Sequence, residues 1–205
     1  MGDKMKATFM QRLFAYFIDY LIISVVFSLF ALSFNTTKLT SINDEINNTM
    51  NEIVNISNEE EQNLDDLNNK LIDLQYEYQQ ESKLASGISL LITFAYFTVF
   101  QFLNKGQTIG KKLLKIKVVN KEEKEPSFVT MFLRTFIVQG ILTTGLSLIG
   151  IFVLDKELYM ETYFILNSLM SIFVVVCALM VLYRKDRRGL HDMMAGSLVV
   201  KEDVE

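Results

Sequence analysis

Four long apolar stretches, separated by strongly polar segments, dominate the pattern of hydrophobic and polar positions along the chain. A bilayer core about 30 Å thick is crossed by roughly 20 apolar residues in a helix. Apolar residues occur all the way round each of these stretches, which predicts membrane spans and not surface helices. The pattern therefore predicts an all-α membrane protein, a four-transmembrane-helix bundle with spans at residues 13–34, 84–103, 128–154 and 163–182.

A cleaved signal peptide is the alternative explanation for the first stretch. A basic segment precedes it, and Ala31-Leu32-Ser33 loosely resembles a cleavage site. The stretch is longer than a typical signal core, however, and it contains Asp19. We therefore expect it to be a membrane span.

The placement of lysine and arginine predicts the orientation of the spans. Basic residues gather before the first stretch and in segments 104–127 and 183–205, whereas segment 35–83 carries three lysines against eleven acidic residues. The net charge of −4 hides this uneven distribution. Cytoplasmic loops carry an excess of Lys and Arg, and four spans bring all three basic segments to one side. We expect a multi-pass protein of the cell membrane with both termini in the cytoplasm.

Segment 35–83, which falls outside the cytoplasm in this orientation, has the pattern of two amphipathic helices. Its apolar residues recur at steps of three or four: Ile42, Ile46, Met50, Ile53 and Ile56, then Leu64, Leu67, Leu71, Leu74 and Tyr78. Between the two series, Ser57-Asn58-Glu59-Glu60 is a capping-box pattern that starts a helix. The segment predicts an extracytoplasmic helical hairpin; a long acidic linker is the alternative. Such a hairpin could bind a partner protein or promote a homodimer, and simple packing explains it equally well.

Two alternating segments predict a small sheet on the cytoplasmic side. Lys115-Ile116-Lys117-Val118-Val119 alternates like a half-exposed strand, and Ser197-Leu198-Val199-Val200-Lys201 is a similar apolar run. The two could pair as a two-stranded sheet that holds the tail close to segment 104–127. Ser127 is placed to cap the third membrane helix.

The chain lacks the residue patterns of common enzymes. Gly106-Gln107-Thr108-Ile109-Gly110-Lys111 resembles a phosphate loop, but only three residues separate its glycines and Lys112 stands where Ser or Thr is required. With one cysteine and one histidine, the chain has no zinc pattern, and no serine has a nucleophile context. We expect no enzymatic activity, no cofactor, no metal site, and no nucleotide or nucleic-acid partner.

Charged residues inside the apolar stretches are the candidate functional groups. Asp19 lies about two turns inside the first span, where a carboxylate is costly and faces the bundle interior or marks a transport path. Arg12 stands two helical turns before Asp19, which is too far for the two side chains to pair. We therefore expect the Arg12 side chain to extend to the cytosol. Arg134 lies at a similar depth in the third span and is the expected partner of Asp19. Asp19 is then either a proton or cation site or a structural anchor.

Three blocks of sequence carry a resemblance to a known family. They are Arg12-Leu13-Phe14-Ala15-Tyr16-Phe17-Ile18-Asp19, then Gly106-Gln107-Thr108-Ile109-Gly110-Lys111-Lys112-Leu113-Leu114-Lys115-Ile116-Lys117-Val118-Val119, and finally the tail from Asp186 to Val200. Together they resemble the RDD family of bacterial membrane proteins, named for one arginine and two aspartates. The resemblance identifies Arg12 as the family arginine and Asp19 and Asp192 as its aspartates. It implies transport of an undefined ligand, and for some members sodium/proton exchange.

The tail offers a structural explanation for Asp192. Residues 190–196 could form a short interfacial helix that ends at Gly196, with Asp192 capping it or pairing with Arg187 or Arg188. His191 is a candidate pH sensor. The glycines of the third span, Gly140, Gly145 and Gly150, would allow close helix contact.

Two functions follow from these observations. The first is a small transporter or cation/proton exchanger that uses Asp19 and forms a homodimer, because four helices are few for a complete pathway. The second is a non-transporting membrane scaffold or accessory subunit that binds partner proteins through its outer hairpin.

Overall fold

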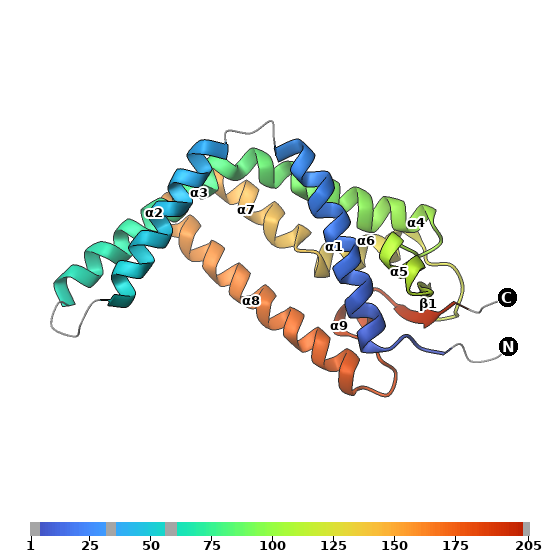
Figure 1. Ribbon diagram of the computed structural model, residues 1–205. Coiled ribbons are helices and arrows are strands. Elements are labelled where there is room, and N and C mark those ends of the chain that lie inside the picture. Colours follow the sequence, from blue (N-terminus) through green and yellow to red (C-terminus); the bar gives the residue numbers. More distant parts are fainter. Residues whose placement is uncertain (1–4, 32–35, 56–60, 203–205) are drawn as a thin grey trace.

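The computed structural model describes residues 5–31, 36–55 and 61–202 (Figure 1). Three of its helical segments are long and apolar enough to cross a membrane: Phe9–Phe30, Leu64–Leu103 and Lys156–Tyr183. Most of their apolar residues face outward, as lipid-facing side chains do. The structure therefore confirms an all-α membrane protein with three to four candidate spans.

These spans correspond to α1 (Phe9–Ala31), to the far part of α3 (Glu61–Phe94), and to α8 (Lys156–Tyr183). After α3 the chain continues without a break through a π-helical turn, η1 (Ala95–Phe100), into α4 (Gln101–Leu103). The last three residues of the expected first span, 32–34, lie outside the described residues.

The expected third span is two helices and not one. α6 (Phe128–Val138) and α7 (Ile141–Val153) meet at an angle of 64°. Gly140 stands at the break with φ of +70°, a left-handed conformation that glycine adopts without steric cost. Four spans result if the bent pair counts as one. Of the other glycines, Gly150 lies against Tyr159, where a Cβ would come within 3.3 Å of the ring.

The described part of segment 35–83 forms the expected helical hairpin. α2 (Thr36–Asn55) runs antiparallel to the first part of α3, with Ile42 and Leu74 buried in the seam. Ion pairs Lys38–Glu81 (2.8 Å) and Lys70–Glu45 (3.2 Å) join the two helices along their length. The second hairpin helix differs from expectation because it continues directly into the membrane span. The proposed capping box at Ser57–Glu60 lies outside the described residues.

The opposite end of the bundle, called the sheet end below, holds the expected antiparallel sheet. β1 (Ile116–Asn120) pairs with β2 (Ser197–Lys201), with Ile116 opposite Lys201. The N-terminal segment joins the other edge of β2 through a bridge between Lys6 and Val200, so the first and last described residues of the chain both lie at this end (Figure 1). Two short helices, α5 (Ile109–Leu113) and α9 (Leu190–Met194), connect the sheet to the membrane helices.

A small core holds the sheet against the membrane helices. Its buried members are Ala7, Ala15, Ile116, Val118, Met131 and Val199. They come from the N-terminal segment, α1, both strands and α6, so parts of the chain that are distant in sequence converge at this point. Ser127 caps α6 as expected, accepting a hydrogen bond from the backbone of Thr130 (3.1 Å).

Candidate functional site

Asp19 is buried, 1% exposed, and accepts three hydrogen bonds from protein groups. The hydroxyl of Thr108 donates to Oδ2 (2.5 Å), while the backbone N–H of Gly110 and the hydroxyl of Tyr96 donate to Oδ1 (2.7 Å each). Hydrogen bonds to the charged form stabilise a carboxylate that is removed from water. We call Asp19 with these three partners the Asp19 site.

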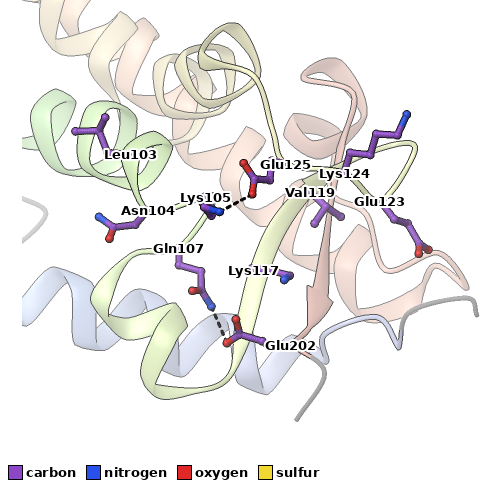
Figure 2. A pocket seen from close by; sticks show the side chains of 10 residues that line it. All are labelled: Leu103, Asn104, Lys105, Gln107, Lys117, Val119, Glu123, Lys124, Glu125 and Glu202. Carbon is purple, nitrogen blue, oxygen red and sulfur yellow. Dashed lines mark hydrogen bonds and ion pairs between the residues drawn. The ribbon is translucent and has the colours of Figure 1, made fainter. Parts of the chain in front are cut away.

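The turn from Gly106 to Gly110 brings two of these donors to α1. Thr108 caps α5, and Gly110 packs so closely on α1 that a Cβ would stand 2.2 Å from the carbonyl oxygen of Ala15. Figure 2 shows how the turn is tied to the tail: the Gln107 amide donates to the Glu202 carboxylate (3.1 Å), next to the start of β1. The turn that resembles a phosphate loop is therefore a clamp on α1.

The third donor comes from the π-helical turn η1. A π turn carries one residue more than an α turn, so it locally changes which side chains face a neighbouring helix. Here it presents Tyr96 to Asp19, and the hydroxyl of Thr135 on α6 donates to the carbonyl of Phe97 (3.0 Å). The irregular turn thus joins α1, the second span and α6.

Asp192 is the centre of a second buried cluster, the Asp192 site. Its carboxylate is fully buried and pairs with two guanidinium groups, those of Arg12 (2.6 Å) and Arg134. It also accepts the backbone N–H of Gly189 (3.2 Å), which caps α9. Arg134 donates further to the hydroxyl of Ser197 (2.9 Å). The tail is thereby bound to both α1 and α6.

The two arginines explain the acidity of Asp192. Burial raises the pKa of this carboxyl, but the charges of Arg134 and Arg12 and the hydrogen bond from His191 outweigh burial, so the pKa lies well below its usual value. A carboxylate with a depressed pKa stabilises the fold above its unfolded-state pKa of about 4 and loses that contribution as pH falls further. The Asp192 carboxyl is therefore ionised at neutral pH.

The structure brings Arg12, Arg134 and Asp192 together, but it corrects three expected contacts. Arg134 pairs with Asp192 and not with Asp19, which has no arginine partner among the residues that the structure describes. Arg12 does not extend to the cytosol: its side chain is 13% exposed, and it also donates to the carbonyl of Arg187 (2.6 Å). Arg187 and Arg188 do not pair with the Asp192 carboxylate; Arg188 instead donates to the Asp192 carbonyl (3.2 Å).

His191 lies inside the Asp192 site, 3.3 Å from the carboxylate. Burial lowers its pKa below the usual value of about 6.5, although Asp192 acts in the opposite direction. The imidazole is therefore neutral at physiological pH, which argues against a sensor that switches near neutrality.

We predict a pH dependence that separates wild type from His191→Gln. Between pH 7 and 8 the difference between their melting temperatures should stay constant. As pH falls from 6.5, the wild type should lose stability relative to the variant, because the unfolded chain takes up a proton that the buried imidazole resists. Melting curves in detergent across pH 5–8 measure this. A gap that widens between pH 7 and 8 would contradict it.

Three pockets line up through the bundle next to these sites. The sheet-end pocket, about 240 Å³, is lined by Arg12, Lys111 and Arg134 among others. The middle pocket, about 370 Å³, lies at the break around Gly140, and the hairpin-end pocket, about 130 Å³, lies near Tyr163. Neighbouring pockets share lining residues: Tyr16, Val138, Gln139 and Val174 for the first two, then Thr143, Thr144 and Asn167 for the last two.

Sequence reasoning missed four residues of this region: Tyr96, Thr108, Gly110 and Lys111. The motif that contains the last three resembles a phosphate loop and a block of the RDD family, and neither comparison predicts a contact with Asp19. The sequence feature that indicates a tight turn here is the pair Gly106 and Gly110 on either side of Thr108, which caps the short helix α5. The contact of Tyr96 with Asp19 could not be predicted, because the apolar pattern does not reveal the π-helical turn that directs Tyr96 toward Asp19. Within the described ranges, no three His, Cys, Asp or Glu side chains gather as a metal site would require.

This fold and these buried charges define a multi-pass helical membrane protein in which Asp19 holds the turn from Gly106 to Gly110 against α1 and Asp192 holds the tail against α1 and α6. The chain belongs to the RDD family, whose model matches residues 6–196.

A curated relative of this chain carries no assigned activity. The chain is 32% identical over 112 residues to the uncharacterized protein YckC of Bacillus subtilis (strain 168). That match covers 53% of this chain and 56% of YckC, so the chain spans about half the length of this relative. No solved structure matches the chain.

Proposed function

We propose that the protein is a small transporter whose solute moves through the three pockets between α1, α3, α6–α7 and α8. The observation that carries the proposal is the sharing of lining residues by neighbouring pockets, which makes them one series from the sheet end to the hairpin end. Polar side chains in a membrane span mark solute paths or the bundle interior. The polar side chains that line this series of pockets include those of Gln139, Thr143, Thr144, Ser147 and Asn167.

The break at Gly140 supports a binding position in the middle pocket. Transporters place solute sites at discontinuous helices near the bilayer centre, where backbone groups freed from the helix can contact the solute. Gln139, Gly140 and Ile141 of the break all line this pocket. Irregular backbone at such a depth is tolerated where it lines a cavity or is buried in protein.

The geometry favours an anchoring role for Asp19 over proton or cation exchange. Asp19 lines none of the three pockets described above, and both its oxygens accept hydrogen bonds from protein donors. A cation at Asp19 would have to displace those donors. Three side chains that do line the sheet-end pocket, Arg12, Lys111 and Arg134, are cationic and repel metal cations.

We also propose that the sheet end faces the cytoplasm, because the segments rich in lysine and arginine lie there. The outer hairpin would then stand outside the membrane on the opposite side. A homodimer would supply further helices around this path, because the spans of one protomer are few for a complete pathway.

Flux measurements in proteoliposomes test the transport proposal. Gradients of Na⁺, K⁺, Li⁺ and inorganic phosphate would be applied to wild type, and solute and proton movement recorded. We expect flux with at least one gradient, and at least a tenfold loss in Asn167→Leu, because Asn167 lines two consecutive pockets. Leu169→Val is the matched control, since Leu169 lies two residues further on α8, about 200° round the helix, and is exposed to lipid.

Asp19→Asn separates the two roles of Asp19 in the same assay. An anchor predicts a lower melting temperature and flux in proportion to the folded fraction. A carrier predicts a folded protein with no flux. Absence of flux in well-folded wild type under every gradient would contradict transport and favour the scaffold hypothesis, to be followed by a search for partners of the outer hairpin.

A further inference from the structure

The sheet-end pocket combines a cationic floor with apolar walls. Arg12, Lys111 and Arg134 contribute the cations. The walls come from both flanking membrane helices and include Leu13, Tyr16, Phe173, Val174 and Val181. A pocket of this composition is complementary to a ligand that is anionic at one end and apolar at the other.

Positive charge exceeds negative charge around this floor. Arg12 and Arg134 share the single carboxylate of Asp192, and neither Asp192 nor Asp19 is among the lining residues. One excess positive charge therefore remains on the two guanidinium groups even after Asp192 is counted. An anionic ligand would balance it without displacing either carboxylate.

Two polar groups of the floor have unused capacity for hydrogen bonding. The Nε of Arg12 is buried and has no hydrogen-bond partner in the described ranges of the chain. The ammonium of Lys111 reaches the Thr108 hydroxyl (3.4 Å) and the face of Phe97 (5.8 Å), and within the described part of the chain it forms no ion pair. Burial lowers the pKa of Lys111 to about 8, so most of this group is still charged at pH 7. Charge-assisted hydrogen bonds to phosphate would satisfy such donors.

The position of the pocket fits a lipid headgroup. Arg12 is the fourth residue of α1, about one turn from the start of this span, where headgroups meet the hydrocarbon core. α1 and α8 converge near α9 and separate away from it, so the apolar walls run from the cationic floor into the membrane (Figure 1). Basic pockets between membrane helices are known sites for anionic headgroups.

We propose that this pocket binds the phosphate group of an anionic phospholipid, with an acyl chain along the wall formed by α1 and α8. This proposal rests on the proposed function in one respect: it takes the sheet-end pocket to be the opening of the transport path. Binding itself is measured without transport, so a failure of binding and a failure of flux are separate results.

The test compares ligands that share the phosphate. Delipidated full-length protein in detergent is titrated with phosphatidylglycerol, with zwitterionic phosphatidylcholine, or with inorganic phosphate, and the melting temperature is recorded. Native mass spectrometry counts the lipids retained. We expect a saturable rise and one retained lipid with phosphatidylglycerol alone. An equal rise with phosphatidylcholine would overturn the charge argument, and an equal rise with inorganic phosphate would overturn the lipid assignment.

Lys111→Gln and Lys112→Gln form the matched pair of variants. The two lysines are adjacent on α5, but Lys112 is exposed and outside the pocket. We expect at least a tenfold weaker apparent affinity in Lys111→Gln and little change in Lys112→Gln. Lys111 is chosen because it lies outside the Asp192 site, so its loss leaves the ion pairs intact. Equal weakening by both variants would mean general surface attraction and would overturn the site.

Discussion

Replacing Asp192 by alanine should destabilise the protein more than any other single change at the sheet end. The substitution leaves the guanidinium groups of Arg12 and Arg134 buried without a counter-charge, and breaking a buried ion pair in this way costs about 3–5 kcal/mol. It also removes the cap on α9. The free energy of unfolding in mixed detergent micelles measures the loss.

Asp186→Ala is the control for this prediction. Asp186 pairs with Arg184 (2.8 Å) only six residues before Asp192, but on the exposed surface. Exposed pairs contribute about 0–1 kcal/mol, so this variant should stay close to wild type. Leucine at positions 12, 134 and 192 together should recover part of the stability lost in Asp192→Ala, because no unpaired charge is then buried. If Asp192→Ala and Asp186→Ala behaved alike, the Asp192 site would not be a stabilising cluster.

Gly110→Ala should have the second largest effect. The added methyl would stand 2.2 Å from the backbone oxygen of Ala15 and 2.8 Å from the Asp19 carboxylate, so the turn must leave α1. Overpacking of this kind costs about 1–3 kcal/mol, and we expect the upper end because a helix backbone cannot yield as a side chain can. The displaced turn would also withdraw two of the three donors to Asp19.

Gly87→Ala and a double-mutant cycle test whether the clash with α1 causes the destabilisation expected in Gly110→Ala. A Cβ at Gly87 in α3 meets nothing within 4 Å, so alanine there should be neutral or stabilise the helix by up to about 1 kcal/mol. If Gly110→Ala acts by releasing Asp19, then adding Asp19→Asn to it should cost much less than Asp19→Asn costs alone. Fully additive losses would show that the clash acts elsewhere.

The pattern of apolar and polar positions was sufficient to predict the architecture. Spans, helical hairpin and sheet follow from length, periodicity and alternation, which are local properties. The break at Gly140 could not be predicted in this way, because the residues on both sides remain apolar. A single glycine in an apolar helix is compatible with an unbroken span. Only the packing of α6 and α7 decides whether the helix is broken at Gly140.

The candidate residues were found in the sequence, but their partners were not. Depth in the membrane predicts Asp19 as the partner of Arg134. Depth fixes a position along the bundle axis and leaves the direction around each helix undetermined, so it cannot choose between two carboxylates. Asp192 reaches the same level only because the tail folds back through α9 and β2 against α1 and α6.

The separation of Arg12 and Asp192 by 180 residues also sets an order of events in biosynthesis. At a synthesis rate of about 5–20 residues per second, roughly 10–35 s pass between the appearance of the arginine and that of its carboxylate. During this interval α1 is in place with an uncompensated cation at its start. The tail therefore completes the buried ion pairs last, and a ribosome that stops between codons 183 and 192 leaves a chain whose membrane-spanning helices are complete but which lacks the Asp192 carboxylate.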